Sequence, residues 1–131
     1  MKSLKAAVFG TGFVGRVHIE GIRRLGNLEV YAIGVGPDDD AARLGAELHV
    51  DKVSQEYRKL LQDPAIDAVH VCTPNVLQFA IVKAALEAGK HVVCEKPLAM
   101  STAEAREMVQ LARSEKLRNC TFHNLRYYPM V

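Results

Sequence analysis

Short apolar runs alternate along the chain with longer segments in which apolar residues recur at helical spacing. The runs are nearly continuous instead of alternating with polar residues, which is typical of strands buried on both faces of a parallel sheet. Six such strands are predicted, at residues 4–9, 29–35, 50–53, 68–72, 91–94 and 119–124. Because helical segments separate them, the pattern predicts an α/β fold with helices on both faces of the sheet.

Five helices are predicted between these strands, at residues 13–25 and 39–48 and around residues 57–61, 77–88 and 105–112. The first presents an apolar face that contains Val14, His18, Ile22 and Leu25. The fourth presents one that contains Leu77, Ile81, Ala84, Ala85 and Ala88. His18 is therefore interpreted as a packed residue rather than a catalytic one. Ser54 and Ser101 are candidate N-caps, and Gly89 is a candidate left-handed C-cap.

The composition of the 131 residues, 49% hydrophobic and 24% charged, is that of one globular domain. Seventeen basic residues nearly balance fifteen acidic ones, so nothing predicts binding to nucleic acid, and no apolar run predicts a membrane span. Three widely spaced cysteines, Cys72, Cys94 and Cys120, lie in apolar runs. They favour a cytoplasmic protein without disulfides, and the dispersed histidines do not predict a metal site.

Residues 10–15, Gly10-Thr11-Gly12-Phe13-Val14-Gly15, have the pattern G-x-G-x-x-G between a predicted strand and a predicted helix. In a dinucleotide site Gly10 permits the tight turn, Gly12 lets the backbone approach a pyrophosphate, and Gly15 allows close packing of helix and strand. A glycine-rich structural turn is the alternative interpretation. Methyltransferases use related loops, but they usually carry an acidic residue where this chain has Phe9.

Further polar segments follow the later strands, at the edge of a parallel sheet where ligands bind. These are Val35-Gly36-Pro37, Cys72-Thr73-Pro74-Asn75, Glu95-Lys96-Pro97 and residues 124–129. A lysine at this edge can donate a hydrogen bond to a substrate oxygen. From the pattern alone, a solvated Glu95–Lys96 ion pair and a helix-starting turn at Thr73-Pro74 are equally good interpretations.

Taken together and in this order, the glycine loop and the later motifs resemble those of the Gfo/Idh/MocA oxidoreductases. The resemblance covers essentially the whole chain. It implies a doubly wound Rossmann sheet of strand order 3-2-1-4-5-6 that holds a nicotinamide cofactor, and substrates that are sugars, cyclitols or related polyols. It also implies that Lys96 is catalytic, that a cis bond precedes Pro97, that Asn75 lies near the nicotinamide ribose and that Arg126 lies at the cofactor edge. The expected cofactor-binding residues are Gly10, Thr11, Gly12, Phe13, Val14, Gly15, Val35, Gly36, Cys72, Thr73, Pro74, Asn75, Glu95, Lys96, Pro97 and Arg126.

The chain departs from the family pattern in three ways. The C-terminal domain that carries the family's catalytic His and most of the substrate pocket is not in these residues, so residues 1–131 are interpreted as the cofactor-binding domain, inactive alone. Gln78 stands where many members have a His, and it cannot take a proton. Val35 stands where an acidic residue would bind the adenosine ribose.

Charge near Val35 favours NAD over NADP. No Arg or Lys lies between Gly34 and Asp40, and the run Asp38–Asp40 would repel a 2′-phosphate, although backbone N–H groups near Gly36 leave NADP open. We expect an NAD(P)-dependent oxidoreductase whose sugar or polyol substrate is bound by the second domain, and whose parent protein is a homo-oligomer. The alternatives are a non-catalytic module that senses dinucleotides and another Rossmann enzyme, such as a methyltransferase.

Overall fold

A computed structural model describes residues 3–130 of the chain and contains one sheet of six parallel strands. The strands are β1 (Leu4–Phe9), β2 (Leu28–Gly34), β3 (Lys52–Ser54), β4 (Ala68–Val71), β5 (His91–Glu95) and β6 (Asn119–Phe122). Their order across the sheet is β3-β2-β1-β4-β5-β6, and every neighbouring pair is parallel. This confirms the α/β class, the six strands and the order 3-2-1-4-5-6.

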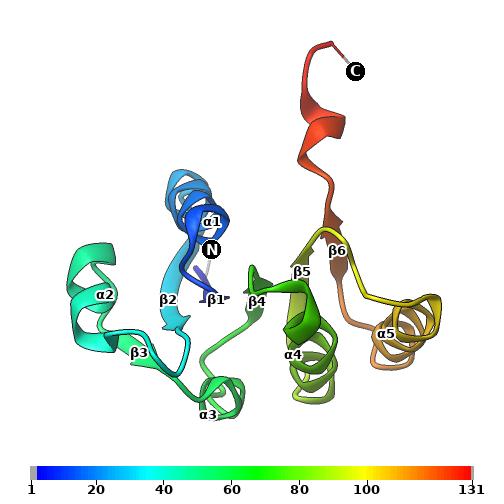
Figure 1. The fold of residues 1–131 in the computed structure, drawn as a ribbon, viewed down its shortest axis with the longest axis horizontal. Coiled ribbons are helices and arrows are strands. Elements are labelled where there is room, and N and C mark those ends of the chain that lie inside the picture. The colour runs from blue at the N-terminus through cyan, green and yellow to red at the C-terminus, as the bar shows by residue number, and fades with distance from the viewer. Residues whose placement is uncertain (1–2, 131) are drawn as a thin grey trace.

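Five α-helices and one short 3-10 helix connect and follow the strands. They are α1 (Phe13–Arg24), α2 (Ala41–Leu48), α3 (Tyr57–Leu61), α4 (Asn75–Glu87), α5 (Thr102–Ser114) and the 3-10 helix η1 (Asn124–Tyr127). α1 and α2 cover one face of the sheet, and α3, α4 and α5 cover the other (Figure 1). None of the helices within residues 3–130 has the length and apolarity needed to cross a membrane.

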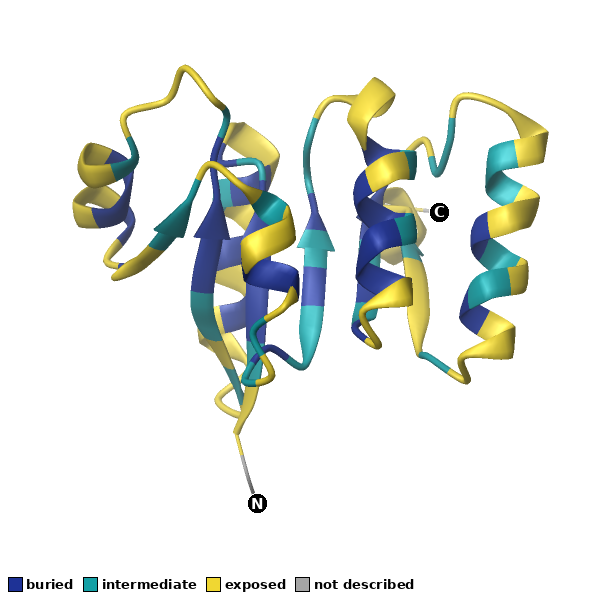
Figure 2. Ribbon diagram, turned by 90° about the horizontal axis from the view of Figure 1, so that it is seen from below, coloured by how far each residue is buried: buried dark blue, intermediate teal, exposed yellow. Residues whose placement is uncertain are grey.

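The core consists of two apolar layers, one on each face of the sheet, and β1 contributes to both. Ala6 and Val8 pack toward α1 and α2, whereas Ala7 and Phe9 pack on the opposite face. All four are at most 1% exposed. Because successive side chains of a strand point to opposite faces, a strand covered on both sides must be apolar at every position. Figure 2 shows the buried residues on the strands and on the helix surfaces that face them.

Two of the predicted helix-end signals, Gly89 and Ser101, are confirmed. Gly89 has a φ of +73°, a conformation that glycine adopts readily. The Ser101 hydroxyl accepts a hydrogen bond from the Glu104 N–H at 3.2 Å, as in a capping box. The structure adds an N-cap on α2, where the carboxylate of Asp40 accepts from the Arg43 N–H at 3.0 Å.

The predicted apolar faces of α1 and α4 are confirmed in part, because His18 and Ile22 in α1 and Ile81, Ala84 and Ala85 in α4 are buried. Val14 in α1 and Leu25, the residue that follows its last turn, are exposed, while the buried residues of the helix are Gly15, His18, Ile19 and Ile22. In α4, Leu77 is half exposed, whereas Gln78 is buried. Both sets fit a helical period, and the close approach of α1 through Gly15 selects the face that is buried.

Several predicted boundaries were also wrong. The hydroxyl of Ser54 accepts from the Glu56 N–H at 3.0 Å, which makes a turn after β3 rather than a cap on α3. β3 lies at Lys52–Ser54 instead of residues 50–53 because its partner is the end of β2. β6 ends at Phe122, and the chain continues into η1, which leads away from the sheet (Figure 1).

Candidate functional site

The carboxyl ends of the strands lie at one edge of the sheet, and the loops that follow β1, β2 and β4 are joined there by backbone hydrogen bonds. The Gly10 N–H donates to the carbonyl of Gly34 at 2.9 Å, and the Cys72 N–H donates to the carbonyl of Phe9 at 2.7 Å. β1 and β4 are neighbours, but β1 leads to α1 on one face and β4 leads to α4 on the other. This is the switch point at which open α/β sheets bind ligands.

Packing within the fold explains two of the three glycines of the loop. Gly10 has a φ of +89°, and a Cβ there would stand 2.5 Å from the carbonyl oxygen of Cys72. A Cβ at Gly15 would stand 2.9 Å from the carbonyl carbon of Gly10 and closer still to its oxygen. Packing therefore requires both. A Cβ at Gly12 would meet nothing within 4 Å, so the fold alone does not explain this glycine.

The N-terminus of α1 is left without a cap. The N-cap residue is Gly12, which has no side chain to cap the first turn, and that turn contains no acidic residue. The first hydrogen bond back along the chain runs from the Arg16 N–H to the carbonyl of Gly12, at 3.1 Å. The N–H groups before it have no partner within the helix and carry the positive end of its dipole. An exposed loop with free donors is suited to a phosphate.

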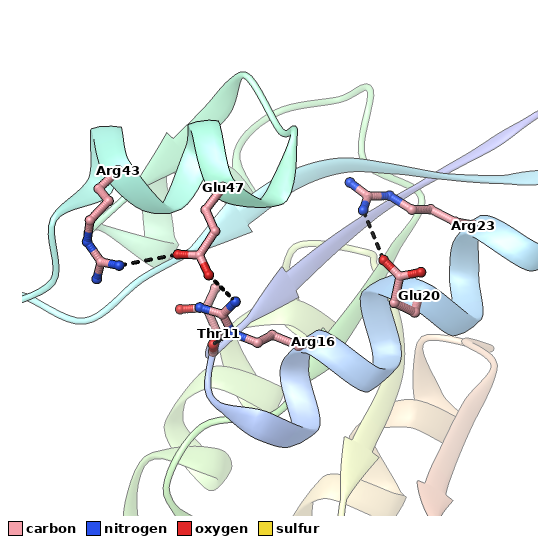
Figure 3. Close-up of polar contacts among 6 residues, drawn as sticks. All are labelled: Thr11, Arg16, Glu20, Arg23, Arg43 and Glu47. Carbon is pink, nitrogen blue, oxygen red and sulfur yellow. Dashed lines mark hydrogen bonds and ion pairs between the residues drawn. The ribbon is translucent and has the colours of Figure 1, made fainter.

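A charged cluster supports the loop from the side of α2 (Figure 3). Nε of Arg16 donates to the carbonyl of Thr11 at 3.2 Å, and the same guanidinium pairs with Glu47 at 2.5 Å. Arg43 pairs with the other oxygen of Glu47 at 3.2 Å. Hydrogen bonding to Arg16 lowers the pKa of Glu47, and Glu47 raises the pKa of Arg16. Arg16 therefore holds the glycine loop through the Thr11 carbonyl, and Glu47 balances its positive charge.

The end of β2 differs from the expectation that free N–H groups lie near Gly36. The Gly36 N–H donates to the carboxylate of Asp39 at 2.6 Å. The amide of Gln55 donates to the carbonyls of Pro37 and Asp39, both at 3.0 Å, and holds this loop in place. Val35 is 7% exposed and packs in the core, so its side chain is turned away from this edge. The Asp39 carboxylate thus takes the Gly36 N–H, one of the groups that the sequence analysis left open for the 2′-phosphate of NADP.

The segment after β4 contains buried polar atoms without partners. The amide nitrogen of Gln78 donates to the carbonyl of Thr73 at 3.4 Å. Within residues 3–130, the Thr73 hydroxyl and the Gln78 amide oxygen are buried without a hydrogen-bond partner. Unpaired buried polar atoms are costly and call for a partner. Burial raises the pKa of the nearby Cys72 thiol to about 12, so the thiol is neutral. Asn75 begins α4 directly after Pro74.

The segment after β5 does not form the solvated Glu95–Lys96 pair. Glu95 is 9% exposed, whereas Lys96 is exposed. One carboxylate oxygen of Glu95 lies 2.9 Å from Nε2 of His18, and the other accepts the backbone N–H of Lys96 at 3.2 Å. The Lys96–Pro97 bond is cis, as the family resemblance implied. Arg126, in η1, is exposed.

A buried polar cluster that the sequence analysis missed joins α1, β4 and β5. Nδ1 of His18 lies 2.9 Å from Nδ1 of His70, and its Nε2 bonds to Glu95. The His18 ring packs edge-on against Phe122, with centroids 4.7 Å apart. His18 is packed as predicted, but with polar partners. A histidine within an apolar strand and a carboxylate at the end of another were the available signals.

We expect acid to destabilise the protein through His70. Burial, with the nearby His18, lowers the pKa of His70 from 6.5 to about 4. The fold therefore favours the neutral ring, and this contribution is complete above pH 6.5 and lost as the pH falls toward 4. Its loss should reduce the free energy of unfolding by up to about 3 kcal/mol. Urea unfolding at pH 7 and pH 4.5 measures it. In His70→Gln the difference in the free energy of unfolding between the two pH values should be smaller by the contribution of His70. An unchanged difference would show that His70 is not the group responsible.

The family model described as an oxidoreductase family with an NAD-binding Rossmann fold, Gfo/Idh/MocA, matches residues 4–123. The uncharacterized oxidoreductase YrbE of Bacillus subtilis is 32% identical over 98% of this chain. The myo-inositol 2-dehydrogenase of Thermotoga maritima is 30% identical over 95%. The chain spans 38% and 37% of the length of these two relatives.

Solved structures give the same result. An NAD binding oxidoreductase from Klebsiella pneumoniae matches with a TM-score of 0.92 at 33% identity, over 97% of this chain and 36% of that one. Biliverdin reductase from Synechocystis, solved with biliverdin and NADP+, matches with a TM-score of 0.85 at 32% identity, over 92% of this chain and 38% of that one. Levoglucosan dehydrogenase in complex with NADH and L-sorbose matches with a TM-score of 0.89 at 27% identity, over 95% of this chain and 35% of that one.

Proposed function

The chain belongs to the Gfo/Idh/MocA family of oxidoreductases with an NAD-binding Rossmann fold, and we propose that it binds NAD for hydride transfer to or from a sugar, cyclitol or related polyol. Two of the relatives by name act on compounds of this kind, myo-inositol 2-dehydrogenase and levoglucosan dehydrogenase. Because the chain spans little more than a third of its relatives, the proposed reaction is that of a longer enzyme of which these residues are the cofactor-binding domain.

One observation carries the proposal: the uncapped N-terminus of α1 behind an exposed Gly12 that has no neighbour within 4 Å of its Cβ position. A structural turn explains Gly10 and Gly15 but leaves Gly12 without a reason. A pyrophosphate that contacts the backbone at residue 12 supplies one, because any side chain there would stand in its way. The residues present therefore fit a dinucleotide.

In the proposed arrangement, the N–H groups of residues 12–15 bind the pyrophosphate. The unpartnered oxygens of Thr73 and Gln78, together with Asn75 at the start of α4, offer hydrogen bonds to the nicotinamide ribose. A bound nicotinamide supplies or accepts the hydride. Lys96 holds a proton at the substrate oxygen. Gln78 offers a hydrogen bond to the bound cofactor and takes no proton. Arg126 borders the cofactor from η1.

The two alternative functions make different predictions. A methyltransferase should bind S-adenosylmethionine, whereas we expect NAD and not S-adenosylmethionine to raise the melting temperature of the 131-residue chain. A module that only senses dinucleotides would bind NAD equally well, but the parent enzyme would show no turnover that depends on Lys96. Thermal melts with both ligands decide the first alternative. Sugar and cyclitol oxidation by the parent protein and its Lys96→Ala variant decides the second.

The loop after β2 supports NAD as the preferred cofactor. The Asp39 carboxylate occupies the Gly36 N–H, and Asp38 and Asp40 add negative charge beside it. We expect NAD to bind at least roughly threefold more tightly than NADP at low salt, and the difference to shrink as salt screens the carboxylates. Asp39→Asn should reduce the difference in affinity between NAD and NADP more than the matched change Asp38→Asn does. Calorimetric titration measures both, and tighter binding of NADP by the unmodified chain would overturn the preference.

A further inference from the structure

The carboxylate of Glu95 connects helix α1 to the backbone of Lys96. Glu95 is the last residue of β5, and its two oxygens have separate partners: Nε2 of His18 at 2.9 Å and the Lys96 N–H at 3.2 Å. The His18 side chain is 4% exposed and that of Glu95 is 11% exposed. Water therefore has little access, and the orientation of the carboxylate depends on these two donors.

A buried carboxylate is costly unless donors satisfy it. A carboxylate can only accept, so Nε2 of His18 carries the proton between them. Nδ1 of His18 lies 2.9 Å from Nδ1 of His70. Because each ring nitrogen of His18 has its own partner, the orientation of the ring is fixed. With one oxygen of Glu95 held by His18, the other is directed at the N–H of Lys96. Losing the His18 bond would free the carboxylate to turn toward solvent.

The helix that carries His18 is also the helix that begins at the glycine loop. His18 follows the N-cap residue Gly12 by six positions, about 9 Å along the helix axis. The same rigid element therefore contacts the loop proposed for the pyrophosphate and, through Glu95, the residue proposed to act on the substrate. Nothing else in the described polar contacts of Glu95 links it to α1.

We propose that His18 is a positioning residue for Lys96, acting through Glu95, and that it fixes the Lys96 backbone relative to the nicotinamide half of the cofactor. This role rests on the proposed function, since it assumes a dinucleotide bound at α1. The hydrogen bonds of the His18 ring within the cluster go to His70 and Glu95, so His18 acts on Lys96 only through Glu95.

Two substitutions of His18 separate its two nitrogens. In His18→Gln the side-chain amide nitrogen lies near the position of Nε2 and can still donate to Glu95. In His18→Asn the shorter amide lies near Nδ1, so the bond to His70 is kept and the bond to Glu95 is lost. Glu95→Gln, of the same shape, is a further variant, because its amide cannot accept from both donors. It keeps the proposal testable if His18→Asn does not fold.

The experiment uses the 131-residue chain with NADH and ADP-ribose as probes. ADP-ribose shares the adenosine and pyrophosphate but has no nicotinamide. We expect His18→Asn to weaken NADH binding about tenfold while ADP-ribose binding stays within about twofold, and His18→Gln to restore most of the loss. General destabilisation would weaken both ligands alike. Hydrogen exchange at the Lys96 N–H should be about tenfold faster in His18→Asn than in His18→Gln. The Val92 N–H, which donates within the sheet, is the reference.

Equal losses for both ligands, or no rescue by His18→Gln, would overturn the positioning role. So would unchanged exchange at Lys96 in both His18→Asn and Glu95→Gln. If the unmodified chain bound neither NADH nor ADP-ribose, the proposed function would be wrong, while the exchange of the Lys96 N–H would still decide whether His18 positions it.

Discussion

Gly12→Val should abolish dinucleotide binding and leave the fold intact. The Cβ position at residue 12 has no neighbour within 4 Å, and the backbone there is not in the left-handed region, with a φ of −67°. A valine is therefore tolerated by the protein. Its branched side chain would stand over the N–H groups of the first turn of α1, where the pyrophosphate must contact backbone. We expect the dissociation constant for NADH to rise at least about a hundredfold, with the free energy of unfolding within about 1 kcal/mol.

Fluorescence titration with NADH measures the binding, and urea unfolding measures the stability. Gly21→Val is the matched control, because Gly21 lies later in α1 and also has no atom within 4 Å of its Cβ position. It should bind NADH like the unmodified chain. Equal affinities of Gly12→Val and the control would remove the cofactor assignment.

The features that the sequence predicted correctly are local. The N-cap at Ser101 and the C-cap at Gly89 each depend on residues that are close in the chain. Such helix ends are signals that a single sequence contains in full. The strand order was implied by the family resemblance instead, because the fixed hand of helical crossovers reduces the possible arrangements without selecting one.

The features that it missed depend on contacts between distant segments. The predicted and observed faces of α1 share His18 and Ile22, and the approach of Gly15 to Gly10 buries Gly15 rather than Val14. The cluster of His18, His70 and Glu95 joins residues that are 52 and 77 positions apart. Their pairing requires the neighbouring positions of β4 and β5 in the sheet, which periodicity does not specify. The contact of Asp39 with Gly36 is local, but a run of aspartates does not indicate which one turns back.

Gly15→Ala and Gly21→Ala should change stability in opposite directions although both lie in α1. A Cβ at residue 15 would press on the carbonyl group of Gly10, which belongs to a backbone that cannot move away, since Gly10 itself is closed in by the carbonyl of Cys72. Crowding against packed backbone is destabilising by about 1–3 kcal/mol or more, and relief would require α1 to leave the sheet. We expect the free energy of unfolding of Gly15→Ala to fall by at least about 2 kcal/mol.

At Gly21 the same methyl group meets open space on the exposed side of the helix. Alanine restricts the unfolded chain more than glycine does, so Gly21→Ala should be more stable by about 0.5–1 kcal/mol. Urea unfolding of the two variants beside the unmodified chain gives both changes, and NADH titration adds a second comparison. Gly21→Ala should retain full affinity, whereas any Gly15→Ala that folds should bind weakly, because its glycine loop is displaced. If Gly15→Ala were as stable as Gly21→Ala, the close packing of α1 on the loop would be wrong, and with it the reason for the third glycine of the motif.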